Sequence, residues 1–278
     1  MIPLEDNFDD VINKAQRGLK LSDERLAEQA GVSPEELDRA KAGQFDERVV
    51  RKLALVLGLG EDAIVILGQK MWRPRAQEVL SLAAFNTPFE GMTVNAYLVW
   101  DHKAKLAAVF DTGSDTTGLI QFARDNHLTA THVFLTHSHY DHVFDLPRLK
   151  KATGAKAFSS ELEPVEDTEA FDPGTVFNVG NLHIDTRQTS GHSRGGTTYV
   201  VQGLDRLVAV VGDALFAASM GGGMVSYEQA LRTNRSQIFS LPDETILCPG
   251  HGPMTTVGEE KLHNPFFPEF QRTGNKDL

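Results

Sequence analysis

Apolar and polar positions follow two different periodicities along the chain. In residues 1–70 the apolar side chains recur three or four positions apart, as at Val49, Leu53 and Val56, which is the spacing of one helix face. Turn signals separate these segments, and residues 33–36 form a capping box with a proline in the first turn. The pattern predicts a small all-helical domain over residues 1–70.

Beyond a predicted join at residues 68–76, the pattern becomes that of strands. Short runs rich in β-branched and aromatic residues alternate with turn signals. The predicted strands cover residues 79–85, 93–100, 106–110, 131–135, 155–158, 182–187, 197–202, 207–211 and 245–249. The predicted helices cover residues 117–126, 143–151 and 227–239. Runs of strands interrupted by helices favour an α+β fold, an αββα sandwich, over residues 71–278.

The helical domain has the outline of a helix-turn-helix, and residues 26–33 resemble the phage-repressor type. The resemblance implies DNA binding. However, the second helix, residues 34–42, carries three carboxylates against two cations, and residues 1–70 hold 14 acidic and 10 basic residues. Contacts to phosphates supply most of the affinity for DNA, so this acidity disfavours DNA binding. Two interpretations stay open: a module for homodimerisation or protein contact, and a sequence-specific DNA binder.

Composition limits the partners and the compartment. A net charge of -11 argues against a polyanionic substrate. No apolar run reaches the roughly 20 residues that span a bilayer, and the first residues lack the features of a signal peptide, so we expect no membrane partner and a cytoplasmic location. Cys248 is the only cysteine, which excludes an internal disulfide. Its position in a strand-like run predicts a buried structural role.

The most informative stretch is residues 135–142, which follows a predicted strand. It places His137, His139, Asp141 and His142 within six consecutive residues. Alternation along an extended chain sends the first three to one side, while His142 lies beside Asp141 at a predicted helix start. Imidazoles and carboxylates are costly to bury without partners, so the run predicts a metal centre whose ligands can be divided between two ions.

Three later motifs add further donors at predicted strand ends. His192 and His251 each follow a glycine, and Asp213 follows an apolar strand and a glycine. Each motif is weak alone, but all four in this order indicate a dinuclear site. Imidazole and carboxylate suit zinc, iron or manganese equally, so these ligands do not select the metal. We expect two divalent ions, with zinc as the first expectation and iron or manganese as alternatives. The remaining histidines show no ligand pattern and are interpreted as surface or packing residues: His102, His127, His132, His183 and His263.

With these motifs, residues 76–278 resemble a metallo-β-lactamase-fold hydrolase, and the tail at residues 252–266 is similar to the glyoxalase-II-like branch. The resemblance implies a first metal on His137, His139 and His192, a second on Asp141, His142 and His251, and Asp213 as the bridge. It implies a metal-dependent hydrolase, similar to hydroxyacylglutathione hydrolases, in which a metal-bridging hydroxide attacks a thioester or a related ester or lactone. Asp141 is the expected catalytic proton carrier, and Asp111 is expected to orient a histidine.

Related activities leave alternatives. The C-terminal helical domain by which larger glyoxalase II enzymes hold glutathione is not seen, which leaves the glutathione substrate open. A true β-lactamase is disfavoured because such enzymes typically have a cysteine where this chain has Asp213, and flavin-linked di-iron proteins usually have a glutamate in place of His139. One alternative is a mononuclear-iron persulfide dioxygenase, with iron on His137, His192 and Asp213. Another is a metal- or ligand-responsive DNA-binding regulator, although the complete ligand set favours catalysis.

Residues 219–227 are expected to shape the substrate pocket. Their glycines allow close approach of the backbone to a ligand, Met220 and Met224 offer adaptable apolar surface, and Tyr227 carries a hydroxyl donor. The alternative is a flexible loop that precedes the helix beginning at Tyr227.

Overall fold

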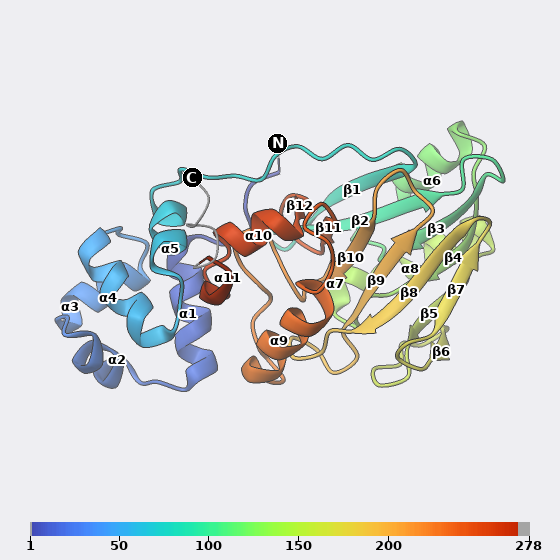
Figure 1. Ribbon diagram of the computed structural model, residues 1–278. Helices are drawn as coiled ribbons and strands as arrows, with labels where there is room; N and C mark the ends of the chain where they lie inside the picture. The colour runs from blue at the N-terminus through green and yellow to red at the C-terminus, as the bar shows by residue number, and fades with distance from the viewer. Residues whose placement is uncertain (1, 272–278) are drawn as a thin grey trace.

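The computed structural model describes residues 2–271, and within them a helical unit precedes a two-sheet sandwich (Figure 1). The helical unit contains α1 (Phe8–Leu19), α2 (Asp23–Ala30), α3 (Pro34–Lys41), α4 (Glu47–Leu57) and α5 (Glu61–Gly68). Helix α3 begins at the capping box, as the sequence predicts. Ser33 and Glu36 form the expected capping box, and Gly31 ends α2 in the left-handed conformation.

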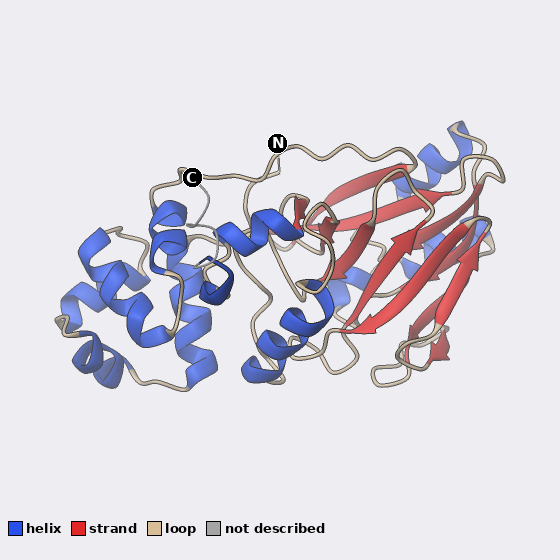
Figure 2. Ribbon diagram, viewed as in Figure 1, coloured by secondary structure: helices blue, strands red, loops and turns tan. Residues whose placement is uncertain are grey.

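After an extended linker, the chain forms two six-stranded sheets (Figure 2). The first contains, in spatial order, β1 (Leu82–Phe89), β2 (Met92–Trp100), β3 (Leu106–Phe110), β4 (Thr129–Phe134), β5 (Lys156–Ser160) and β6 (Glu169–Phe171). The second contains β12 (Thr255–Thr256), β11 (Ile246–Pro249), β10 (Val208–Gly212), β9 (Thr197–Gln202), β8 (Leu182–Gln188) and β7 (Val176–Val179). The β3–β4, β4–β5, β5–β6 and β10–β11 pairs are parallel.

The two sheets pack face to face over an aromatic-rich core that includes Phe110, Phe134 and Tyr199. Helices α6 (Thr117–Asp125) and α8 (Leu146–Thr153) cover the outer face of the first sheet. The outer face of the second sheet is covered by α9 (Tyr227–Thr233), α10 (Val257–His263) and the helical unit. The predicted αββα sandwich is confirmed. None of the described helices is both long and apolar enough to cross a lipid bilayer.

The differences from the predicted elements lie where the sequence signal is weak. The predicted helix over residues 227–239 is α9 followed by a π-helical turn, Asn234–Ile238. Strand β1 begins and ends later than the predicted strand over residues 79–85, and it includes Pro88, which an edge strand tolerates. Strands β6, β7 and β12 are not among the predicted elements, and each is only two to four residues long.

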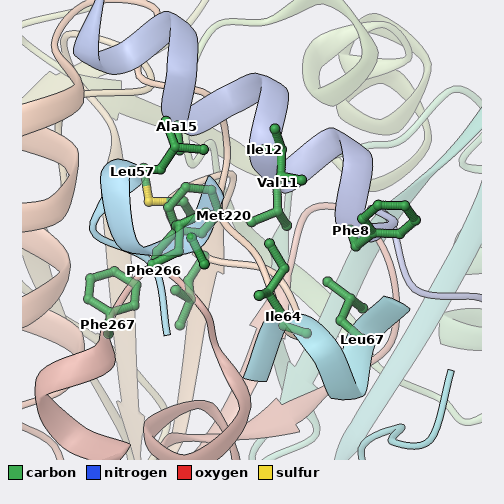
Figure 3. Packing of buried hydrophobic residues seen from close by; sticks show 14 of the residues in the cluster. Phe8, Val11, Ile12, Ala15, Leu57, Ile64, Leu67, Met220, Phe266 and Phe267 are labelled. Carbon is green, nitrogen blue, oxygen red and sulfur yellow. The ribbon is translucent and has the colours of Figure 1, made fainter. Parts of the chain in front are cut away.

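The helical unit and the sandwich share one hydrophobic core (Figure 3). From the helical unit, Val11, Ile12 and Ile64 are buried in this cluster. From the sandwich, Met220 and Phe266 belong to the same cluster. A backbone hydrogen bond of 2.8 Å from Gly60 N to Pro265 O also joins the two parts. The linker separates them along the chain, but the packing between them is continuous.

Candidate metal centre

The seven residues expected as metal ligands meet at one edge of the sandwich. The segment after β4 carries His137 and His139, and the short helix α7 (Tyr140–Val143) carries Asp141 and His142. The other three follow strands of the second sheet: His192 comes after β8, Asp213 directly after β10 and His251 after β11. Parallel pairing of β10 with β11 brings the last two to the same edge. The structure therefore brings together all residues that the motifs single out.

These residues form two groups that could each hold a metal ion. The first contains His137, His139, His192 and Asp213, and the second contains Asp141, His142 and His251. Within each group, one ligand atom from every residue lies within 4.8 Å of the others.

The carboxylate of Asp213 lies between the two groups. Its Oδ2 is 3.4 Å from Nε2 of His192 and 3.6 Å from Nε2 of His251, and its Oδ1 is 3.3 Å from Nε2 of His142. This is the position that a bridging ligand requires.

Unpaired polar atoms show that the donors suit a cation. Nε2 of His137, Nε2 of His142 and Oδ1 of Asp213 are buried and have no hydrogen-bond partner. Buried polar atoms without partners are uncommon because each costs about 1–3 kcal/mol. A divalent ion bound by imidazole nitrogen and carboxylate oxygen would satisfy these atoms.

Hydrogen bonds to the far side of the imidazoles fix their orientation. Nδ1 of His142 lies 2.8 Å from Oδ2 of Asp111, so Asp111 orients a histidine as expected. Nδ1 of His251 lies 2.7 Å from the Thr93 carbonyl oxygen, and Nδ1 of His192 lies 3.0 Å from that of Gly222. A carbonyl oxygen only accepts, so in the last two rings Nδ1 carries the proton and Nε2 is free to bind a metal.

The charge states of His137 and Asp213 suit metal binding. Burial, with His142 nearby, lowers the pKa of His137 well below its usual value. Burial opposes ionisation of Asp213, but His142 and His251 outweigh it and hold the pKa of that carboxyl well below its usual value. Neutral imidazole and ionised carboxylate are the forms that coordinate metals. Burial opposes protonation of His142 and His251, but the nearby carboxylates outweigh it and raise the pKa of His142 well above its usual value and that of His251 to about 9. A metal ion bound by these two rings would therefore displace a proton from each.

Glu163 supports the site, although nothing in its sequence context marks it. Its carboxylate accepts hydrogen bonds from the Ser138 amide at 2.9 Å, from the Ser138 hydroxyl and from the Gly195 amide at 2.7 Å. It therefore joins the loop of His137 and His139 to the loop of His192. Burial opposes its ionisation, but these hydrogen bonds outweigh it and lower its pKa.

The expected pocket residues are placed differently from the prediction. Met220 is fully buried in the shared core and has no surface to offer a substrate, so its predicted role is wrong. The Tyr227 ring packs against Gly18 of α1, where an added Cβ would come within 2.3 Å of it, so this ring also serves packing. Met224 is 73% exposed, and its role stays a prediction. Met220 and Tyr227 pack against the helical unit, which sequence patterns did not indicate.

Residues 90–251 match the family model of the metallo-beta-lactamase superfamily, over more than half of the chain. The chain belongs to this superfamily. Its members bind divalent metals, and all seven residues of the two groups lie within the matched region. The helical unit lies outside it.

Individual relatives differ in the activities for which they are named. The hydroxyacylglutathione hydrolase GloC of Haemophilus influenzae is 28% identical over 204 residues, which cover 64% of this chain and 95% of that protein. The crystal structure of BLEG-1, a B3 metallo-beta-lactamase, is similar with a TM-score of 0.58 and 27% identity, covering 66% of this chain and 99% of that one. The crystal structure of ETHE1 from Myxococcus xanthus is similar with a TM-score of 0.59 and 26% identity, covering 69% of this chain and 91% of that one.

Proposed function

We propose that this superfamily member is a dinuclear metal-dependent hydrolase of thioesters or related esters and lactones, similar to hydroxyacylglutathione hydrolase. The observation that carries the proposal is the second group, Asp141, His142 and His251, assembled beside the first across Asp213. An alternative centre with one iron on His137, His192 and Asp213 would leave that group without a role.

The residues around the centre support acyl-group hydrolysis. Two bound divalent ions, zinc in our proposal, would supply an acidified water and polarise the substrate carbonyl. Asp141 is 14% exposed, with Oδ2 at 3.2 Å from Nε2 of His251 and 3.4 Å from Nε2 of His142. Burial opposes ionisation of Asp141, but His251 and His142 outweigh it and lower its pKa. The lowered pKa keeps Asp141 ionised at neutral pH, and in our proposal this carboxylate accepts a proton during turnover and delivers it to the leaving group.

Aromatic side chains beside the ligands support a partly apolar substrate. Tyr140 and Phe144 are 65% and 44% exposed, and both lie edge to face with Phe89 of the β1–β2 hairpin. In our proposal this cluster contacts the acyl group. The similarity to GloC makes S-D-lactoylglutathione the first substrate to test.

For the helix-turn-helix outline of α2 and α3, we propose association with a second copy or another protein. In the first turn of α3, Glu35 is exposed and would repel phosphate, whereas Glu36 is ion-paired with Arg48. Specific binding to duplex DNA at physiological salt would contradict the proposed association role and favour a metal- or ligand-responsive DNA-binding regulator. We also place the protein in the cytoplasm, which the lone buried thiol of Cys248 supports.

The test is metal analysis of protein purified without added metal, run beside turnover assays. The substrates are S-D-lactoylglutathione, a lactone and a β-lactam, and oxygen uptake is followed with glutathione persulfide. Two metals per chain with thioester or lactone hydrolysis support the proposal. One iron per chain with oxygen uptake refutes it, and turnover of the β-lactam alone would replace the proposed substrate class.

Matched variants show whether the second group takes part. Asp141→Ala and His142→Ala should each lower turnover by about 10²–10⁴-fold, the range for removing a proton carrier or a ligand it depends on. The exposed residues Asp125 and His102 provide the controls, and Asp125→Ala and His102→Ala should retain full turnover. Full activity in Asp141→Ala would remove Asp141 from its proposed role.

A further inference from the structure

The loop of residues 216–222 connects Asp213 to the group that orients His192. The Gly221 amide donates to the Asp213 carbonyl oxygen at 3.1 Å, and the next residue, Gly222, supplies the carbonyl oxygen 3.0 Å from Nδ1 of His192. A Cβ added at Gly221 would lie 2.0 Å from the Asp213 carbonyl oxygen and 2.7 Å from that same Nδ1. Any displacement of this loop therefore moves the support of His192.

Helix α10 holds one side of the loop. Glu260 accepts a hydrogen bond from the Ala218 amide at 2.9 Å, and the Asn264 side chain donates to the Ser219 carbonyl oxygen at 2.8 Å. Ala218 has φ +59°, which is unfavourable for a residue with a Cβ. Such a conformation persists only where the surroundings impose it.

The helical unit holds the other side through a buried ion pair. Asp6 accepts hydrogen bonds from Lys14 Nζ and from the Ser219 hydroxyl, and Lys14 also donates to the Met220 carbonyl oxygen at 3.0 Å. The side chains of Asp6 and Lys14 are only 8% and 15% exposed. Charges this deeply buried are costly unless their partners stay in place, so the pair requires the loop to stay in one position.

The same lysine also reaches the second group. Nζ of Lys14 lies 5.1 Å from the centre of the Phe216 ring, and that ring packs edge to face with His251 at 5.6 Å. Val11 and Ile12, on the same helix, are buried in the cluster that contains Met220 (Figure 3). One helix of the N-terminal unit thus contacts the surroundings of both metal groups.

We propose that the helical unit is a working part of the metal centre, in which Asp6 and Lys14 are positioning residues that hold the 216–222 loop and, through its Gly222 carbonyl group, fix His192. The inference rests on the metal centre of the proposed function. Loss of either partner removes one of the two sets of contacts that hold the loop, and loosening the support of a metal ligand typically costs about 10–100-fold in metal affinity. The affinity for the ion held by the group of His192 should fall more than the affinity for the other ion.

The experiment measures the affinity of both metal ions in full-length variants by competition with a chelator, with Co²⁺ as the spectroscopic probe. Lys14→Met keeps the aliphatic stem and removes the charge, Asp6→Asn keeps the shape, and Ser219→Ala removes one hydroxyl. The control is the exposed ion pair of Lys41 and Asp23 in the same unit, through Lys41→Met and Asp23→Asn. His192→Ala provides the reference spectrum for loss of the first ion.

We expect Lys14→Met and Asp6→Asn to lower the affinity for one ion at least about tenfold and to show the same spectral change as His192→Ala. Ser219→Ala should lower the same affinity by a smaller factor. The controls should bind both ions as the wild type does. Unfolding of the metal-free variants is measured separately. If the stability of the metal-free variants changes while both metal affinities stay at the wild-type value, the inference is overturned. If Lys14→Met and Asp6→Asn fail to fold, unchanged affinities in Ser219→Ala overturn it. A wild type that binds no metal refutes the proposed function instead.

Discussion

Glu260 is a fully buried carboxyl group whose hydrogen-bond partners are all uncharged. It accepts from the Ala218 amide, the Asn264 amide group and the Thr255 hydroxyl. Burial raises its pKa from 4.5 to about 8, against the opposing effect of these hydrogen bonds. The folded protein therefore keeps a proton that the unfolded chain releases. The stability that this proton contributes is complete below pH 4.5 and is lost as the pH rises through about 8.

The magnitude follows from the two pKa values. The interval from 4.5 to about 8, at about 1.36 kcal/mol per pH unit, sets an upper limit of about 5 kcal/mol. Glu260→Gln keeps the shape and is neutral at every pH. Its carbonyl oxygen can accept from the Ala218 amide, and its NH₂ group can donate to the Thr255 hydroxyl. The variant should therefore gain stability relative to the wild type as the pH rises.

The assay is urea unfolding of wild type and Glu260→Gln from about pH 5 to about pH 9, over which the wild type alone should lose this contribution. The exposed Glu228 of α9 provides the control, and Glu228→Gln should follow the wild type throughout. Free energies of unfolding that stay parallel for wild type and Glu260→Gln would refute the reasoning. They would mean that Glu260 is ionised in the folded state and is stabilised there by its three donors.

Three further predictions test the site and the core. Asp111→Asn should lower metal affinity about 10–100-fold because His142 loses the carboxylate that orients it, and unchanged affinity in chelator competition would contradict this. Ile12→Ala should lower the free energy of unfolding by about 2–5 kcal/mol, because Ile12 is fully buried in the shared core. Far-UV circular dichroism and tryptophan fluorescence should report one common unfolding transition, and two separate transitions would show independent domains. Cys248 is fully buried, and burial raises the pKa of its thiol, so mass spectrometry should detect alkylation only on unfolding; rapid labelling of the native protein would contradict its structural role.

The metal-centre residues could be predicted because their signal is local. Strand periodicity shows where β4 ends, and alternation beyond it places His137, His139 and Asp141 on one side. The supporting contacts carry no such signal. Glu163 lies in an acidic stretch, and its partner Gly195 is 32 residues away along the chain, so only the fold shows that the two meet.

The helical unit shows the same limit. Capping residues such as Ser33 predict where its helices begin, because a cap involves neighbours three positions apart. The apolar positions of α1 predict a buried face but not what covers it. Met220 packs against this face, although the glycine-rich sequence of its loop predicts a place in a substrate pocket. Periodicity identifies a buried face, whereas the identity of its partner depends on tertiary contacts between residues about 200 positions apart.

A shared core and a buried ion pair change what a partner of the helical unit could do. The ion pair of Asp6 and Lys14 lies against the 216–222 loop, where Ser219 and Met220 supply its further hydrogen bonds. Separating the loop from the pair would leave these buried polar groups without partners, which is costly. Helices α2 and α3 lie on the far side of the unit from the sandwich (Figure 1). A second copy or a protein bound there would leave the metal centre accessible. To alter catalysis it would have to shift α1, because α1 carries Lys14 and the buried face that packs against Met220.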